Sequence, residues 1–258
     1  MTEEQTTYSV REQMVTVAID RIREFCPAEG YYLAFSGGKD SIVIKRLAQM
    51  ADVPFDAHFE FTTIDPPEVL RYIREHHPNV LWNYPAETMW QLIVRKRMPP
   101  TRRVRYCCEE LKERGGSGRF VLLGVRWAES ERRANRRLFE TCTRDRTRHL
   151  INPIIDWSDQ AVWDFIREQG LPYCSLYDEG QDRIGCIMCP CAEKRRHQDA
   201  ERWPQYKRAY IRAFQRMVDK RIADGLKTTW RTGEDVYDWW MTEPKRKGRQ
   251  PEGCSLFE

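Results

Sequence analysis

The most constraining feature of this sequence is a short turn between two apolar stretches. Residues 31–35 (Tyr-Tyr-Leu-Ala-Phe) break into Ser-Gly-Gly-Lys-Asp-Ser at 36–41, and a mostly apolar stretch follows at 42–48. The first run is typical of a buried strand, and the last has the spacing of the first turns of a helix. The sequence therefore predicts a strand, a tight glycine turn and a helix in immediate succession.

The turn has the chemistry of an anion site. Gly37 and Gly38 allow close approach of the backbone, and N–H groups at a helix N-terminus point toward an anion. Lys39 adds a point charge, and Ser36 and Ser41 add hydroxyl donors. The spacing differs from the Walker A pattern, which places four residues between its first glycine and Gly-Lys-Ser/Thr. An ordinary Gly-Gly turn is the alternative, and six specified positions after a strand argue against it.

Strand and helix patterns alternate along the first part of the chain. Further strands are predicted at 55–61, 80–84 and 120–125, with helices before the first strand, from about residue 67 and at 87–97. This alternation predicts an α/β fold with a mostly parallel sheet flanked by helices. Ligands of such sheets bind beyond the carboxyl ends of the strands, so Ser36 and Arg126, which both follow a strand, are expected to share one cleft.

The C-terminal part has a different pattern. Ser158 is expected to cap a helix, and residues 203–240 are predicted to be largely helical. Tyr206, Tyr210, Phe214 and Met217 lie at helical spacing there, which favours a core stripe over a base-stacking platform. We therefore expect a nucleotide-binding α/β domain at 1–172 and a mostly helical lobe at 173–258, which carries Cys-x-x-Cys and the C-terminal tail.

Composition and charge limit the classes of protein. The 258 residues carry a net charge of +4, and no apolar run approaches the roughly 18 residues of a membrane span. The first residues lack the pattern of a signal peptide, so a cytoplasmic protein without membrane contact is expected. Basic residues cluster at 95–105, 132–137, 144–149, 194–197 and 245–249. Such clusters suit a polyanionic partner, although a solvated surface explains them equally well.

Nine cysteines in a cytoplasmic chain favour metal or redox chemistry over disulfides. Cys186 and Cys189 have metal-ligand spacing, and the distant pair Cys107 and Cys108 completes four thiolates. Four thiolates fit an iron–sulfur cluster or structural zinc. Cys191 is an alternative ligand, and buried thiols without a metal are the structural alternative. Cys254, near the C-terminus, is expected to be exposed, as a sulfur-carrying thiol or a simple tail residue.

Taken together, these motifs resemble the phosphoadenosine phosphosulfate (PAPS) reductase-like family of pyrophosphate-loop ATP pyrophosphatases. The resemblance covers roughly residues 28–193 and rests on stretches in unbroken order: 36–41, 106–112, 124–134, 152–157, 162–163, 176–180 and 183–190. It implies a fold of the adenine nucleotide alpha hydrolase type. It also implies that the Ser36–Ser41 loop binds the phosphates of ATP.

The resemblance further implies roles for individual residues. Lys39 and Asp40 would act in catalysis with Mg²⁺, and Arg126 and Arg133 would hold phosphates. Glu129 and Ser130 would shape that site. In the bacterial adenosine phosphosulfate (APS) reductases, a four-iron cluster is bound by cysteines similar to Cys107, Cys108, Cys186 and Cys189.

The family contains both reductases and ATP-consuming enzymes. Sulfonucleotide reductases generally have a degenerate loop and end in Glu-Cys-Gly-Leu/Ile-His, whereas this chain keeps Lys39 and Asp40 and has Gly-Cys-Ser at 253–255. Both departures favour an ATP pyrophosphatase that adenylates an acceptor for sulfur transfer. The character is closest to the ATP pyrophosphatase subunits of DNA phosphorothioation systems of the Dnd and Ssp types. An APS/PAPS reductase and a tRNA thiolation enzyme are the alternatives.

The phosphorothioation interpretation also implies cofactors and partners. ATP, Mg²⁺ and a 4Fe-4S cluster are the expected cofactors, with zinc as the alternative metal. A cysteine desulfurase would supply sulfur, DNA is favoured over tRNA as the acceptor, and a homodimer is compatible with the sequence.

Overall fold

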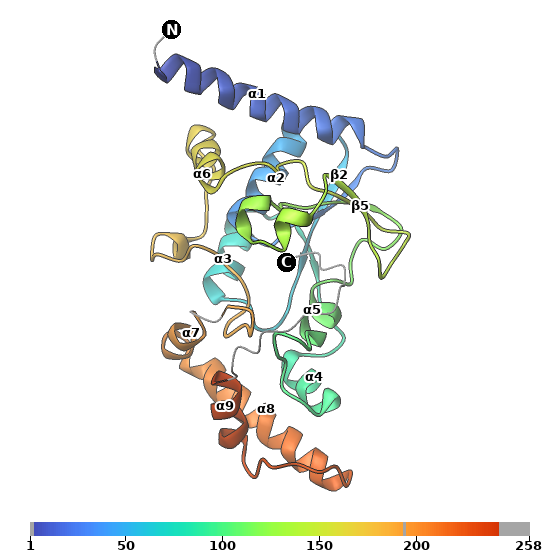
Figure 1. Ribbon diagram of the computed structural model, residues 1–258, viewed down its shortest axis with the longest axis vertical. Coiled ribbons are helices and arrows are strands. Elements are labelled where there is room, and N and C mark those ends of the chain that lie inside the picture. Colours follow the sequence, from blue (N-terminus) through green and yellow to red (C-terminus); the bar gives the residue numbers. More distant parts are fainter. Residues whose placement is uncertain (1–2, 193–194, 243–258) are drawn as a thin grey trace.

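The computed structural model describes residues 3–192 and 195–242, so Cys254 and the basic cluster at 245–249 lie outside the described residues. Six strands form one sheet in the order β3-β2-β1-β4-β6-β5 (Figure 1). The strands are β1 (Tyr31–Ala34), β2 (Phe55–Glu60), β3 (Leu81–Asn83), β4 (Phe120–Leu122), β5 (Phe139–Thr141) and β6 (His149–Ile151). Only β5 runs antiparallel to its neighbour. The predicted mostly parallel sheet is confirmed.

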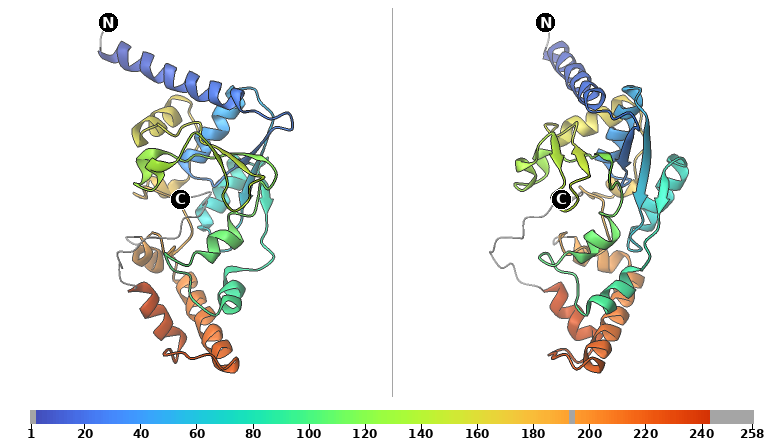
Figure 2. Two further views of the ribbon diagram at one scale, coloured as in Figure 1. Left: turned by 45° about the vertical axis from the view of Figure 1, so that its right-hand side comes forward. Right: turned by 90° about the vertical axis from the view of Figure 1, so that its right-hand side faces the viewer.

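The helices lie around this sheet and beyond one end of it. Figure 2 shows α1 across one end of the molecule and α8 and α9 at the opposite end. The α-helices are α1 (Glu3–Glu24), α2 (Lys39–Met50), α3 (Pro67–His76), α4 (Met89–Lys96), α5 (Tyr106–Leu111), α6 (Asp159–Glu168), α7 (Arg196–Arg202), α8 (Pro204–Ala223) and α9 (Gly233–Met241). Short 3₁₀ turns lie at η1 (Trp127–Glu129), η2 (Arg133–Asn135) and η3 (Ser175–Tyr177). As expected, Ser158 caps α6 by accepting from the N–H of Ala161.

Strands β5 and β6 were not expected from the sequence. Each has three residues, as β3 and β4 do, but Phe-Glu-Thr and His-Leu-Ile lack the longer apolar runs that predict the other two at 80–84 and 120–125. They lie in an arginine- and threonine-rich segment that also contains the turn between them. Because β6 pairs with β4, it extends the sheet on the side away from β2.

The two faces of the sheet are covered differently. Tyr31 and Leu33 of β1 belong to the main core with the helices, whereas Tyr32 and Ala34 belong to a smaller cluster on the opposite face. Gly116 lies close to the Tyr32 ring, since a Cβ there would approach it to 3.2 Å. The second face is thus covered by chain from the β4–β6 half of the molecule.

The C-terminal helices share one core with α4. Tyr210, Phe214 and Met217 are fully buried and Tyr206 is half-buried, so the predicted core stripe of α8 is confirmed. The Trp90 ring of α4 meets the Tyr210 ring edge-on, with centroids 4.9 Å apart. Among the described helices, none has the length and apolar character needed to cross a membrane.

A buried polar chain links α2, the end of α3 and the segment after α6. The Lys45 ammonium lies 3.1 Å from Nδ1 of His77 and donates to Asn79. The His77 Nε2 lies 2.7 Å from the Tyr72 hydroxyl, which donates to the carbonyl of Pro172. A neutral His77 with its proton on Nε2 satisfies every one of these bonds. Protonation of Nδ1 would set a cation against the Lys45 ammonium.

This chain predicts a pH-dependent stability. Burial, with Lys45 and His76 nearby, lowers the pKa of His77 to about 4. The unfolded chain takes up this proton below pH ~6.5 and the folded chain does not, so stability falls as the pH drops from about 6.5 to 4. The expected loss is about 3 kcal/mol, measured by urea denaturation across that range.

The control is His76→Gln, which changes an exposed neighbour and should keep the pH slope. His77→Gln should flatten it, whatever its effect on absolute stability. An unchanged slope in His77→Gln would contradict the assignment.

Candidate functional site

The Ser36–Ser41 loop lies where the strand order of the sheet reverses. From β1 the chain builds outward through β2 and β3 on one side, and β4 and β6 lie on the other. The β1 and β4 strands run parallel, with Leu33 opposite Leu122, so their carboxyl ends open at the same edge. Open α/β sheets bind ligands at such a switch point. The position of the loop is therefore that of a ligand site.

The loop is shaped by its glycines and serines. Gly37 has φ +72°, which favours glycine, and Gly38 is the N-cap of α2. The Ser41 hydroxyl donates to the carbonyl of Gly38 (2.8 Å) and accepts from the N–H of Ser36 (3.2 Å). These bonds close the turn on itself at the N-terminus of α2.

A distant segment, residues 177–182, holds the lysine of the loop. The N–H of Lys39 donates to the Tyr177 hydroxyl (2.9 Å), and its ammonium donates to the carbonyl of Asp182 (2.9 Å). The same ammonium lies 3.2 Å from Asp159. Lys39 is consequently buried, with 4% exposure. To reach a phosphate, its side chain has to exchange the Asp182 carbonyl for the ligand.

Arg126 fastens the start of α2 to the loop that follows β4. Its guanidinium is 1% exposed and donates to Asp40 (2.7 Å) and Asp159 (3.0 Å). Glu129 accepts from the backbone N–H of Arg126 (3.0 Å) and from the Arg133 guanidinium. Ser130 accepts from the N–H of Arg133 (3.3 Å). The buried Arg126 therefore contacts the Asp40 carboxylate from the interior of the protein.

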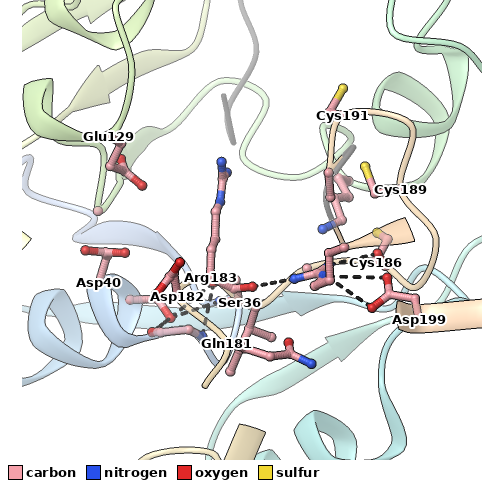
Figure 3. A pocket seen from close by; sticks show the side chains of 18 of the residues that line it. Ser36, Asp40, Glu129, Gln181, Asp182, Arg183, Cys186, Cys189, Cys191 and Asp199 are labelled. Carbon is pink, nitrogen blue, oxygen red and sulfur yellow. Dashed lines mark hydrogen bonds and ion pairs between the residues drawn. The ribbon is translucent and has the colours of Figure 1, made fainter. Parts of the chain in front are cut away.

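One cavity of about 920 Å³ joins the loop to the cysteines. Figure 3 shows Arg183 extending between the carboxylates of Asp40 and Glu129 and the cysteine-bearing turn. The wall includes Ser36, Gly38, Asp40 and Ser41 of the loop, Glu129 and Tyr177, the thiols Cys108, Cys186, Cys189 and Cys191, and Arg102, Arg105, Arg133, Arg183, Arg195 and Arg202. Five residues expected at this site do not line the cavity: Gly37, Lys39, Arg126, Ser130 and Cys107.

Positive charge is concentrated on the wall near the loop. Arg133 is 4% exposed, and burial together with the Arg183 guanidinium lowers its pKa to about 9. Glu129 compensates the charge of Arg133 within the protein. Arg133 and Arg183 both line the cavity beside Asp40, so an anionic ligand there would meet two guanidinium groups.

The cysteines form two thiol pairs. Cys107 donates to Cys108 and Cys191 donates to Cys189, so the pKa values of Cys108 and Cys189 fall while those of Cys107 and Cys191 rise. Arg105 also donates to the sulfur of Cys108 (3.0 Å). Cys186 stands apart, 3.7 Å from the Thr62 hydroxyl, and burial raises its pKa. Each pair thus presents one thiol with thiolate character to the cavity.

The thiols on the cavity are chemically suited to bind a metal ion or a metal cluster. Arg105 and Lys112 lie close enough to offset thiolate charge. Within residues 3–192 and 195–242, however, no three His, Cys, Asp or Glu side chains converge on a single metal position. Structural zinc needs four ligands on one ion, whereas a four-iron cluster spreads its cysteines over several irons. Four thiolates are a donor set that occurs for either group.

Sequence reasoning assigned no role to several residues that the structure places at the site. Tyr177 and Asp182 bind the loop lysine, and Asp159 bridges Lys39 and Arg126. Tyr177 lies within the stretch 176–180, which supports the family resemblance, so this motif could have indicated that Tyr177 belongs to the site. Asp159 follows a helix cap and is indistinguishable by spacing from an exposed helix residue.

The fold and the site define a nucleotide-binding α/β protein with thiols on its cavity. A model of the phosphoadenosine phosphosulfate reductase domain matches residues 30–192. The match covers more than half of the sequence, and the chain belongs to this family. The fold agrees with the crystal structure of PAPS reductase from Candida auris in its phosphate complex. That superposition has a TM-score of 0.51 at 18% identity and covers 72% of this chain and 96% of the other.

Two curated relatives illustrate the range of the family. An uncharacterized protein of Methanocaldococcus jannaschii is 32% identical over 179 residues, which cover 62% of this chain and 36% of that protein. An adenosine 5'-phosphosulfate reductase of Staphylococcus haemolyticus is 27% identical over 154 residues, which cover 57% of this chain and 61% of the reductase. The chain thus spans less than two thirds of the length of these relatives.

Close packing at Gly124 predicts a sensitive position. A Cβ there would lie 2.8 Å from the Cβ and 2.9 Å from the carbonyl carbon of Asp40. Gly124→Ala must displace the start of α2, and a cost of about 1–3 kcal/mol is expected in urea denaturation. Gly185→Ala is the matched control on the same cavity, because the nearest atom, of Arg195, would be 3.6 Å away. Equal stability of the two variants would contradict the close approach.

Proposed function

We propose that this chain is an ATP pyrophosphatase that adenylates an acceptor oxygen, which sulfur then replaces. The observation that carries the proposal is the single cavity that joins the Ser36–Ser41 loop to the thiols of Cys108, Cys186, Cys189 and Cys191. Nucleotide activation requires a substrate to contact the loop, and sulfur transfer requires it to contact the thiols, so both need one cavity that reaches both sets of residues. Membership of the PAPS reductase domain family supports a nucleotide at the loop.

In the first step, an acceptor oxygen attacks the α-phosphorus of ATP and pyrophosphate leaves. The N–H groups at the start of α2 and the hydroxyls of Ser36 and Ser41 stabilise the departing charge. Lys39 supplies a cation once it exchanges the Asp182 carbonyl for a phosphate oxygen. Arg133 offers a further cation from the wall, while Arg126 acts as a positioning residue for Asp40.

Asp40 is the residue that fits a magnesium ion bound with the nucleotide. Its carboxylate lines the cavity beside the loop, and carboxylate oxygens together with phosphates are the usual ligands of Mg²⁺. Such an ion would neutralise phosphate charge. The ion pair with Arg126 orients this carboxylate, which lines the cavity.

In the second step, the terminal sulfur of a persulfide attacks the activated acceptor, and AMP leaves with the original oxygen. A second thiol then cleaves the S–S bond, which leaves sulfur on the acceptor and a disulfide that an external thiol reduces. Cys191 lines the same cavity and is not among the four proposed cluster ligands, so its thiol is the one placed for this exchange. A partner cysteine desulfurase would supply the sulfur.

A four-iron cluster would be held by Cys107, Cys108, Cys186 and Cys189, with Cys191 as the alternative to one of the first pair. Such a cluster would bind the transferred sulfur or stabilise the fold of the cavity wall. Arg105 and Lys112 would compensate its charge.

For the acceptor we propose the DNA backbone. A non-bridging phosphate oxygen is a poor leaving group, and adenylation makes its replacement by sulfur feasible. The arginine-rich cavity wall supports a polyanionic acceptor. A tRNA base is the acceptor to be distinguished from DNA.

Reduction of adenosine phosphosulfate is the second candidate, because a relative with that printed name aligns with 57% of this chain. The thiols on the cavity are compatible with it. A reductase would release sulfite from adenosine phosphosulfate with a thiol donor and would leave ATP intact. Assaying both substrates with one preparation separates the two candidates.

The ATP proposal predicts specific products. Purified protein with Mg²⁺ and ATP should form AMP and pyrophosphate, separated by ion-exchange chromatography. Lys39→Ala should reduce the rate on the order of a hundredfold, because a donor to developing phosphate charge is lost. Lys207→Ala, an exposed lysine on α8, is the control and should keep the wild-type rate. Formation of ADP and phosphate instead would place the chain in another class of nucleotidase.

The acceptor proposal predicts a change in the host's DNA. Deletion of the gene should abolish the sulfur-linked dinucleotides that mass spectrometry detects in digested DNA. Persistence of these dinucleotides in the deletion strain rejects DNA as the acceptor. Cysteine auxotrophy rescued by sulfite would indicate the reductase, and loss of a thiolated tRNA base would move the acceptor to RNA.

A further inference from the structure

The excess of positive over negative charge in this chain is concentrated in helix α8. Its 20 residues include six Lys or Arg and one Asp, a formal net charge of +5. The full chain has a net charge of +4, so the rest of the sequence is close to neutral, at −1. A helix this far from neutrality presents a strong local field to a polyanion.

Three of these charges form a stripe. Arg208, Arg212 and Arg216 are exposed and four residues apart, so each lies about 40° around the helix from the last. The apolar face with Tyr210 and Phe214 points to the opposite side, about 160° away. In the part of the chain that the structure describes, none of the three guanidinium groups has a hydrogen bond or ion pair.

The stripe differs in this respect from basic clusters that are contiguous in the sequence. Many members of those clusters are bound to acidic side chains. The pairs are Arg95 with Glu87 and Glu110, Arg97 with Asp224, Arg136 with Glu140, Arg144 with Glu113, and Arg195 with Asp199. On α8 the charges remain available for a ligand.

We propose that Arg208, Arg212 and Arg216 bind successive phosphates of a DNA duplex, and this inference rests on the proposed function in taking DNA as the acceptor. Three residues at this spacing extend over about 12 Å of the helix axis, which corresponds to three or four phosphates of one strand. The N-terminus of α8 follows Arg202, which lines the cavity. DNA on the stripe therefore runs toward the cavity where its backbone is modified.

The surface chemistry selects a nucleic acid over an acidic protein. Protein interfaces centre on buried apolar or aromatic anchors. Across the described surface, α8 has an exposed large apolar side chain at Ile222, near its C-terminal end, and none between Pro204 and Lys220, where the stripe lies. A guanidinium forms paired hydrogen bonds with phosphate, so a row of arginines is sufficient for contact with a nucleic acid backbone.

The test uses the full-length protein and a fluorescein-labelled DNA duplex of random sequence, followed by anisotropy between about 50 and 200 mM salt. Arg208→Gln/Arg212→Gln/Arg216→Gln should lower the slope of log affinity against log salt by about 2.7 and weaken binding on the order of a hundredfold at ~0.1 M salt. Glutamine retains helix propensity, and circular dichroism checks the fold.

The matched control is Arg71→Gln/Arg137→Gln/Arg146→Gln, which removes the same charge from exposed positions elsewhere and should keep most of the slope. Equal slopes for the stripe variant and the wild type overturn the proposal. It is also overturned if the wild type does not bind the duplex, or if unlabelled tRNA competes better than unlabelled duplex.

Failure of this inference is separable from failure of the proposed function. AMP formation from ATP, measured without DNA, should be equal in the stripe variant and the wild type. Stripe-dependent DNA binding without ATP cleavage would reject the pyrophosphatase and leave the stripe standing. ATP cleavage combined with DNA binding that the stripe variant does not weaken would reject the stripe and leave the pyrophosphatase standing.

Discussion

The site depends on a guanidinium buried at the switch point of the sheet. Arg126 lies between Asp40 of α2 and Asp159 of α6, and Asp159 in turn meets the ammonium of Lys39. The four charges alternate in sign, so the chain is neutral overall although Arg126 and Lys39 are almost inaccessible. A buried charge without its partner costs several kcal/mol. The nucleotide loop is therefore complete only when β4 and α6 have packed against it.

The sequence predicts the secondary structure of this protein better than the contacts between its side chains. Apolar runs of four or more residues predict β1 to β4, and helical spacing predicts α2, α3 and α4 between them. Helix α5 and the strands β5 and β6 have no such run and were not predicted. At the site, residues of the Ser36–Ser41 motif and four of the cysteines line one cavity, whereas Arg126, which was expected to share a cleft with Ser36, does not line it. The pairing of Cys189 with Cys191 and the burial of Arg126 depend on folded contacts that local spacing does not encode.

Charge illustrates the same limit. Contiguous arginines stand out in a sequence, yet the fold supplies acidic partners for many of them, such as Glu113 for Arg144. The arginines of α8 are separated by three residues and are inconspicuous in the sequence. Helical geometry collects them on one side. The distribution of usable charge therefore follows from secondary structure and pairing together rather than from composition.

The short peptide between the residue that holds Lys39 and the thiols has a mechanical consequence. Asp182, whose carbonyl holds Lys39, precedes Cys186 by only four residues. A peptide this short transmits displacement directly, since each residue spans at most ~3.6 Å. Under the proposed function a phosphate takes Lys39 from Asp182, which removes one hydrogen bond at the start of this peptide. The carbonyls of Arg183 and Cys186 stay bound to Arg195, and the N–H of Ile187 stays bound to the carbonyl of Ile64. Occupancy of the loop would then alter the first of several attachments on the peptide that leads to the cysteines.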